Sequence, residues 1–352
     1  MNHGTNERKI ELQNKIASQI PITTEESLEY LKHGNGEFVL ELNEYQSQRG
    51  ELKTPKEYDA AIITCSDARC DCTLFRDFTN TAVAMMQVAG NVVDLQNKAA
   101  RAKIDRVLSK VKNGGTVLET GHINCGAVDA NTHADHYVGK ISRHVDFLVG
   151  LVDRRQSTNF AKDDYKANAI NQAAKLENHP QVIEKGLHVK QCLFDFTDGE
   201  QRVISYLKEG SEPAFIETLR ESGIAIMKYA SENGYGLITQ YAHAIVICDP
   251  MDIGRFTNPR ILFNGRLNEL FCVSAIEESV SSDAIASIEY ALLKVNGVKD
   301  APHVVVLHSD RKTAEKLKST MLATSEIIKS KTKDGSLITV AVYNKETGEI
   351  II

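Results

Sequence analysis

Short, mainly apolar runs alternate with stretches of helical period along this chain, and this alternation constrains its fold more than any other feature. Runs of strand length occur in both halves, at residues 60–64, 82–88, 116–120, 244–248, 271–275 and 303–308. A strand that is apolar on both faces is typical of a parallel sheet covered by helices on both sides. Between such runs, residues 99–112 and 284–295 have a helical pattern. The sequence therefore predicts an α/β fold built from βαβ units around mainly parallel sheets.

The second half of the chain repeats the plan of the first. In the first half a strand leads into Cys65 and a later strand leads into His122, and in the second half Cys248 and His308 stand at a similar spacing. Self-similarity of this kind predicts a repeated architecture. We interpret it as an internal duplication and expect two similar domains that pack against one another within one chain.

The expected domain boundaries follow from this repeat. Residues 1–24 are polar and predict an amino-terminal arm, and Thr23 and Glu26 have the spacing of a capping box at the start of a helix. We expect the first domain at residues 25–205 and the second at residues 206–352, with a polar turn at Thr197–Glu200 near the end of the first domain.

Composition excludes several classes of protein. The chain has 352 residues and a net charge of −6, whereas nucleic-acid-binding proteins usually have a basic surface. No apolar run approaches the roughly 20 residues of a membrane span, and the first residues lack the apolar core of a secretory signal. Seven cysteines, an odd number, then favour reduced thiols and a cytoplasmic location. We expect neither a nucleic-acid nor a membrane partner.

Two groups of reactive side chains come directly after predicted strands. Cys65, Asp67 and Arg69 follow one strand, and His122 and Cys125 follow another. In an open parallel sheet, ligands bind beyond the carboxyl ends of the strands, so these side chains are expected to lie close together. Two thiolates and an imidazole suit tetrahedral Zn²⁺, and three protein ligands leave a fourth position for water, as in catalytic zinc sites.

Asp67 has two alternative roles in such a site. It could bind the metal as a fourth ligand and close the site. Alternatively, it could pair with Arg69, which would hold the carboxylate away from the metal and leave the site open. The open arrangement predicts an activity that rises with pH as the metal-bound water ionises.

Three motifs carry a resemblance to a known family: CSDAR at residues 65–69, AGNVV at 89–93 and GHINCGAVDA at 121–130. Together they resemble the motifs of the β-class carbonic anhydrases, and the similarity extends over roughly residues 25–205. The resemblance implies that Cys65, His122 and Cys125 bind one zinc ion and that Asp67 and Arg69 form the catalytic dyad. The pocket wall that it implies comprises Gln87, Gly90, Asn91 and Gly126.

The activity that the resemblance implies is the reversible hydration of CO₂ to bicarbonate by attack of a zinc-bound hydroxide. Domains of this family pair tightly, and each helps to wall the pocket of the other. A tandem copy would let one chain supply both domains as an intramolecular pseudo-dimer. We expect such chains to form homo-oligomers.

The sequence also departs from the family pattern. Gln87 and Val88 stand where the family usually has Arg-Asn, which removes a charge near the pocket. In the second half Cys248 is kept, but the Asp-x-Arg dyad is missing and Arg311 stands where the second cysteine ligand is required. Arginine remains protonated and cannot bind zinc. We therefore expect one zinc ion per chain and a second domain without a zinc site.

Three other functions remain open at this point. The same zinc site could hydrolyse a CO₂ analogue, carbonyl sulfide or carbon disulfide. The chain could be a catalytically silent zinc-binding scaffold, or a redox thiol protein that uses Cys70 and Cys72.

Three histidines, His133, His136 and His144, follow the site and are either surface residues or proton shuttles.

Overall fold

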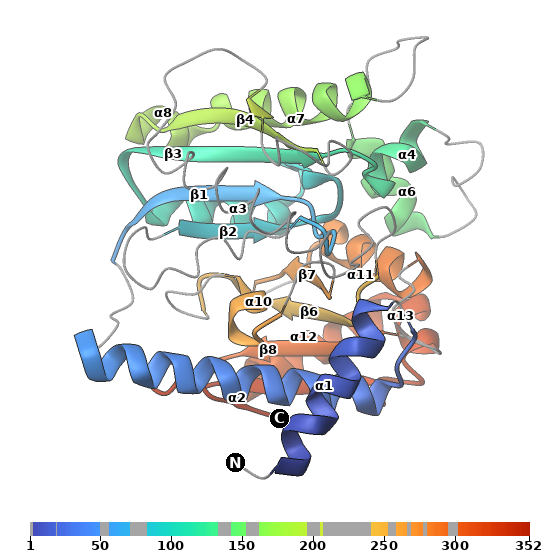
Figure 1. Ribbon diagram of the computed structural model, residues 1–352. Helices are drawn as coiled ribbons and strands as arrows, with labels where there is room; N and C mark the ends of the chain where they lie inside the picture. The colour runs from blue at the N-terminus through green and yellow to red at the C-terminus, as the bar shows by residue number, and fades with distance from the viewer. Residues whose placement is uncertain are drawn as a thin grey trace.

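The computed structural model describes residues 3–18, 20–49, 56–70, 83–132, 142–152, 162–195, 205–206, 241–252, 258–265, 269–276, 280–294 and 302–352. These residues form two α/β units, each built on a five-stranded sheet, and the sheets lie one above the other in Figure 1. The predicted fold class, α/β with mainly parallel sheets flanked by helices, is confirmed. Cys72, His133, His136 and the turn predicted at Thr197–Glu200 lie outside the described residues.

The first unit contains a sheet with the strand order β2-β1-β3-β4-β5. All its neighbouring strands are parallel except β4 and β5, which are antiparallel. Its strands are β1 (Tyr58–Thr64), β2 (Val83–Gln87), β3 (Val111–His122), β4 (His188–Phe194) and β5 (Ser205–Tyr206). Its helices are the short 3₁₀ helix η2 (Ala89–Asn91), α3 (Lys98–Lys110), α4 (Gly126–Thr132), α6 (Arg143–Leu151), α7 (Lys162–Glu177) and α8 (Pro180–Lys185).

The second unit has the same strand order, read as β7-β6-β8-β9-β10, and again only the last strand is antiparallel. Its strands are β6 (Ala244–Cys248), β7 (Leu270–Ser274), β8 (His303–His308), β9 (Ile338–Tyr343) and β10 (Ile350–Ile351). Its helices are α10 (Pro259–Leu262), α11 (Ser282–Lys294), α12 (Arg311–Thr324) and α13 (Glu326–Lys331). The matching topology supports the predicted duplication, which itself stays a prediction.

Burial on both faces explains why the strands are continuously apolar. In β1, Ala60 and Ile62 pack into one hydrophobic core, whereas Ala61 and Ile63 pack into another on the opposite face of the sheet. Strand β3 is longer than the run predicted at residues 116–120, because it begins directly after α3 and includes Gly114 and Gly115. Gly114 has a φ of 70°, and the pairing of β1 with β3 shifts register at this end.

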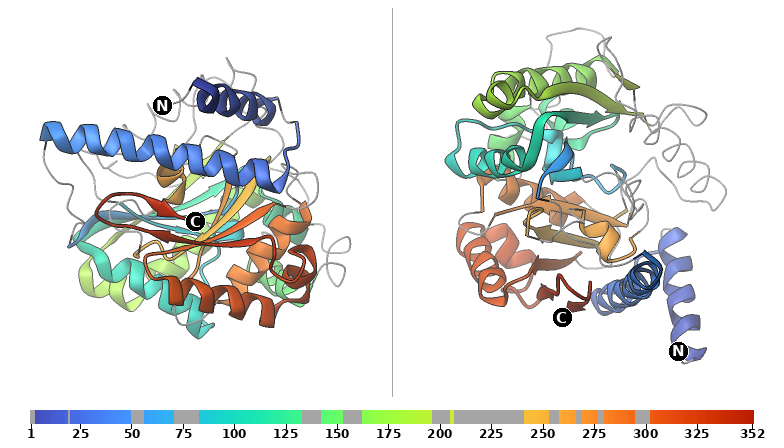
Figure 2. Two further views of the ribbon diagram at one scale, coloured as in Figure 1. Left: turned by 90° about the horizontal axis from the view of Figure 1, so that it is seen from below. Right: turned by 90° about the vertical axis from the view of Figure 1, so that its left-hand side faces the viewer.

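The amino-terminal helices α1 (His3–Ala17) and α2 (Thr24–Arg49) lie beside the second unit (Figures 1 and 2). The predicted capping box starts α2: Thr23 Oγ1 accepts from Glu26 N–H at 3.1 Å, and Glu26 accepts from Thr23 N–H at 2.9 Å. Asn35 then donates to the carbonyl oxygens of Leu262 and Gly348. The helix that was expected to open the first domain thus contacts the second unit.

The two units meet through β2 and β7 and through α6 and α11. The main-chain N–H of Gln87 donates to Ser274 Oγ at 2.8 Å, and these are the last residues of β2 and β7. Lys103 and Asp283 form an ion pair of 2.7 Å across the interface, and both side chains are buried. The edge of the first sheet where the sequence predicts the metal site therefore lies beside a packed contact with the second unit. Among the described helices, none has the length and apolar character needed to cross a membrane.

The buried ion pair predicts a non-additive effect of mutation. Removing one partner leaves an uncompensated buried charge, so Lys103→Met or Asp283→Leu alone should lower the free energy of unfolding by about 3–5 kcal/mol. The double variant leaves no such charge and should recover most of that loss. Urea unfolding of the wild type, the two single variants and the double variant measures this. Additive losses would contradict the interpretation.

Candidate metal centre

The structure brings together the three side chains that the sequence predicted as metal ligands. The ligand atoms of Cys65, His122 and Cys125 all lie within 4.8 Å of one another, and the two sulfur atoms are 4.0 Å apart. All three residues are buried. Within the described part of the chain, this is the one cluster of three or more such side chains that could hold a metal ion.

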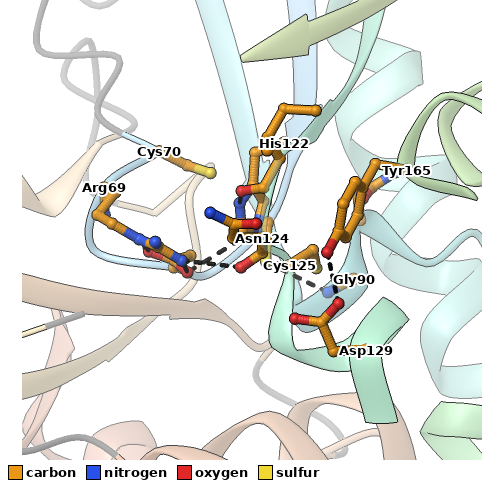
Figure 3. Close-up of polar contacts among 12 residues, drawn as sticks. Arg69, Cys70, Gly90, His122, Asn124, Cys125, Asp129 and Tyr165 are labelled. Carbon is orange, nitrogen blue, oxygen red and sulfur yellow. Dashed lines mark hydrogen bonds and ion pairs between the residues drawn. The ribbon is translucent and has the colours of Figure 1, made fainter. Parts of the chain in front are cut away.

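Strand pairing explains this proximity. β1 and β3 are adjacent and parallel, and Thr64 is the register partner of Thr120, so both strands deliver their next residues to the same edge of the sheet. Cys65 directly follows β1, and His122 is the last residue of β3. Asn124, with a φ of 57°, lets the chain turn back so that Cys125 also faces the cluster (Figure 3).

A hydrogen bond orients the imidazole. His122 Nδ1 donates to the carbonyl oxygen of Ile123 at 3.0 Å, which leaves Nε2 as the atom that can bind a metal. His122 Nε2 is 3.8 Å from Asp67 Oδ2. Burial lowers the pKa of His122, but the negative charges of Cys65 and Asp67 outweigh it, so the pKa lies above its usual value.

The two thiols of the cluster titrate as a pair. Burial opposes ionisation of Cys65, but hydrogen bonds from the thiols of Cys125 and Cys70 and the charge of His122 hold the pKa of Cys65 well below its usual range. The N–H of Gly90 also donates to Cys65 Sγ at 3.3 Å. The hydrogen bond to Cys65 and burial raise the pKa of Cys125. One thiolate therefore forms readily, and a divalent cation would stabilise the second.

This donor set fits zinc. Two soft thiolates and one imidazole are a ligand set that Zn²⁺ prefers, and three protein ligands leave one position open. Cys70 differs from the other two thiols, because burial raises its pKa well above the usual value. Since the thiolate is the reactive form, a neutral Cys70 gives no support to the redox alternative.

Asp67 is held by Arg69 in a bidentate ion pair. Arg69 Nε donates to Asp67 Oδ1 at 2.9 Å, and Arg69 Nη2 donates to Asp67 Oδ2 at 2.6 Å. Arg69 Nη2 also donates to the carbonyl oxygen of Asn124, in the turn between two ligands. Both carboxylate oxygens are thus bound to the guanidinium, which is the arrangement expected of the open form.

Three of the predicted pocket residues, Gly90, Gly126 and Gln87, lie at close contacts of the main chain or at the contact with the second unit. Gly90 has a φ of 70°, a conformation that favours glycine, and a Cβ there would lie 3.0 Å from Ala127 Cβ. A Cβ on Gly126 would lie 1.9 Å from the hydroxyl oxygen of Tyr290, so this glycine allows a tyrosine of the second unit to approach the site. Gln87 is buried where β2 meets the second unit.

A buried polar network that was not predicted from the sequence lies behind the turn of Gly90. Asn91 donates to Glu119 Oε1 at 2.5 Å, and Asn168 donates to Asn91 Oδ1 and to the carbonyl oxygen of Gly90. Burial raises the pKa of Glu119 well above its usual value, which favours the neutral form of this carboxyl group. An acidic residue inside the strand predicted at residues 116–120 was the available signal. The network supports the turn that donates to Cys65.

Of the two alternatives for His144, the open surface position is wrong. Its Nδ1 is 3.1 Å from Glu289 Oε1, and the imidazole is largely covered in the contact between the two units.

The second unit presents a different arrangement at the equivalent strand ends. Asp252 accepts hydrogen bonds from Ser309 and Lys345 and lies 3.3 Å from His308. Next to Cys248, Asp249 is paired at 3.1 Å with Arg106, which comes from the first unit. Ion pairs thus fill the place where a metal site would be expected by analogy.

Part of the first unit is similar to a known protein family. Residues 60–201 match the sequence model of a family described as carbonic anhydrase. This segment covers the metal cluster and four of the five strands of the first sheet, and the resemblance drawn from the motifs is confirmed over it. No curated protein sequence matches the chain.

Solved structures of β-carbonic anhydrases are similar to part of the chain. A tetrameric enzyme of the ascomycete Sordaria macrospora is 20% identical, with a TM-score of 0.38, over 50% of this chain and 92% of its own. A Coccomyxa enzyme in complex with acetazolamide is 18% identical, with a TM-score of 0.38, over 56% and 92%. An Aspergillus fumigatus enzyme is 21% identical, with a TM-score of 0.38, over 54% and 91%.

The neutral carboxyl group of Glu119 predicts a pH dependence of stability. Above the ordinary pKa of glutamate the unfolded chain releases this proton while the folded chain keeps it, so rising pH favours unfolding until the folded group ionises. One such proton contributes up to about 1.4 kcal/mol per pH unit. Glu119→Gln is neutral in both states, so its free energy of unfolding should fall less steeply above about pH 5 than that of the wild type.

Urea unfolding at several pH values measures this difference. Glu184→Gln, at an exposed glutamate of α8, is the matched control and should keep the wild-type slope. Parallel slopes for the wild type and Glu119→Gln would contradict the assignment of a neutral carboxyl group.

Proposed function

We propose that this chain, in which residues 60–201 form a domain of the carbonic anhydrase family, catalyses the reversible hydration of CO₂ to bicarbonate at a zinc ion held by Cys65, His122 and Cys125. The observation that carries the proposal is the buried cluster of these three side chains beside a carboxylate that is bound to Arg69. The cluster provides three metal ligands, and the Asp67 carboxylate provides a hydrogen-bond acceptor next to the coordination position that these ligands leave open.

Each residue then has a physical task. Zinc bound at this site would act as a Lewis acid and bring the pKa of a water molecule close to neutrality. The Ile123 carbonyl fixes the tautomer of His122, and the N–H of Gly90 stabilises the negative charge of Cys65. These hydrogen bonds hold the ligands in one geometry, as the outer contacts of metal ligands generally do.

Asp67 and Arg69 orient the reactants. Arg69 binds both oxygens of Asp67 and keeps the carboxylate directed toward the cluster. In this position Asp67 can accept a hydrogen bond from the attacking water, which turns a lone pair of that water toward the carbon of CO₂. The reaction adds the water oxygen to CO₂ and releases one proton, which a solvent base removes.

The missing charge at Gln87 and the packed second unit are the reasons to consider two alternative functions. A hydrolase of carbonyl sulfide or carbon disulfide would use the same ligands, and a silent zinc-binding scaffold would keep the metal without turnover. Nothing in the described geometry favours either over CO₂ hydration. We include in the proposal one zinc ion per chain, a homo-oligomer of chains and a cytoplasmic location.

A pair of cysteine variants tests the zinc site. Cys65→Ser should lose most of its zinc and its CO₂ hydration activity, because a serine hydroxyl is a poor substitute for a thiolate ligand. Cys248→Ser, at the equivalent strand end of the second unit, is the matched control and should keep both. Metal analysis and stopped-flow CO₂ hydration at about pH 8.5 provide the two measurements. Zinc loss in Cys248→Ser alone would overturn the assignment.

A substrate panel distinguishes the three functions. We expect the wild-type protein to hydrate CO₂ above the buffer rate, with a rate that rises from about pH 7 to about pH 9 as water ionises. Hydrolysis of carbonyl sulfide or carbon disulfide without CO₂ hydration would identify the analogue hydrolase. Bound zinc with no turnover of any of these substrates would identify the scaffold.

A further inference from the structure

Among the residues that the structure describes, Arg260 has the largest fully buried side chain, and it comes from α10 of the second unit. Its guanidinium donates to main-chain carbonyl oxygens on two units. Within the second unit, Nε and Nη2 donate to Leu270 O at 3.2 and 2.9 Å. Across the interface, Nη1 donates to Cys70 O and Nη2 donates to Asp67 O, each at 3.1 Å. Burial of an ionised group is costly, so these hydrogen bonds are needed to offset it.

The two carbonyl groups that Arg260 reaches in the first unit are the ends of one turn. Cys70 N–H donates to Asp67 O at 3.0 Å and closes this turn. The turn carries Asp67 and Arg69, the ion pair beside the metal ligands. Arg260 therefore holds the main chain at both ends of the segment whose side chains face the metal centre (Figure 3 shows Arg69 and Cys70 on this segment).

We propose that Arg260 is a positioning residue, through which the second unit keeps the Asp67 carboxylate on Arg69 and off the metal. The inference rests on the proposed function, because it assigns a role within the same zinc site. It also gives the second unit a task in a reaction whose ligands it does not supply.

The distances show why the position of this turn matters. Asp67 Oδ2 is 3.8 Å from His122 Nε2, so a small movement of the turn would bring the carboxylate within reach of a metal held by that nitrogen. A carboxylate is itself a good zinc ligand. The two hydrogen bonds from Arg260 oppose this movement, since they fix the turn to a helix and a strand of the other unit.

The test uses the full chain with Co²⁺ in place of Zn²⁺ and thiocyanate as the probe. Thiocyanate can bind the metal only where the fourth position is open, and its binding changes the visible absorption of cobalt. We expect the wild type to bind thiocyanate and Arg260→Met to bind it at least tenfold more weakly, because Asp67 then occupies the position. The second change Asp67→Asn should restore binding to Arg260→Met. CO₂ hydration by Arg260→Met should fall by about ten- to a hundredfold in kcat/KM.

Two further variants keep the test decisive. The double variant Lys103→Met/Asp283→Leu removes another buried ionic contact between the units without touching the turn, and it should bind thiocyanate like the wild type. Arg260→Lys keeps the charge but cannot span the three carbonyl groups, so it should show an intermediate loss. It decides the question if Arg260→Met does not fold.

The outcomes separate the inference from the proposed function. A folded, cobalt-loaded Arg260 variant with wild-type thiocyanate affinity would overturn the positioning role. A wild-type chain that binds neither cobalt nor zinc would instead overturn the proposed function. Because thiocyanate binding requires no turnover, the positioning role can be judged even if the wild type does not hydrate CO₂.

Discussion

Two buried thiols with sulfur atoms 4.0 Å apart are the constraint on which the rest of this structure depends. A single thiolate is stabilised at Cys65 by the hydrogen bonds around it, but the hydrogen bond to Cys65, burial and the charge of Cys65 raise the pKa of Cys125. The pair is therefore poorly satisfied by protein groups alone and well satisfied by a divalent cation, whose binding would displace the remaining proton. Strand register, the turn at Asn124 and the Gly90 turn all act to keep these two sulfur atoms and His122 Nε2 in one place.

The second unit contributes to the surroundings of this cluster, although its own strand ends have ion pairs where the first unit has ligands. Tyr290 lies against Gly126, next to a ligand, and Arg260 holds the turn of Asp67. Burial of the cluster thus depends on contacts between the units as well as on the first sheet. A small α/β unit whose strand ends open toward solvent would leave such thiolates more exposed, and exposure weakens every electrostatic interaction of the site.

Much of this arrangement could be predicted from local pattern. Continuous apolar runs gave the buried strands, and the rule that parallel strands end at one edge of a sheet brought Cys65 and His122 together. Residues whose role depends on distant contacts could not be predicted in this way. Arg260 contacts a carbonyl group 193 residues away, and nothing in its own segment indicates that partner. Glu119 was visible as an anomaly in a strand, but its raised pKa comes from complete burial, and the hydrogen bond from Asn91 that opposes this shift also exists only in the folded chain.

A comparison of α3 with α11 explains how two units of one topology come to differ. Both helices have 13 residues, and Arg106 and Tyr290 occupy the same position along them. Each side chain reaches across the interface toward the strand ends of the other unit: Tyr290 lies against Gly126, and Arg106 pairs with Asp249 beside Cys248. A tyrosine adds a largely apolar wall to the first site, whereas an arginine brings a fixed positive charge to the second. Arg106 occupies the Asp249 carboxylate in an ion pair, and Arg311 has no lone pair to offer a metal, so both favour a second unit that supports the first rather than one that binds its own metal.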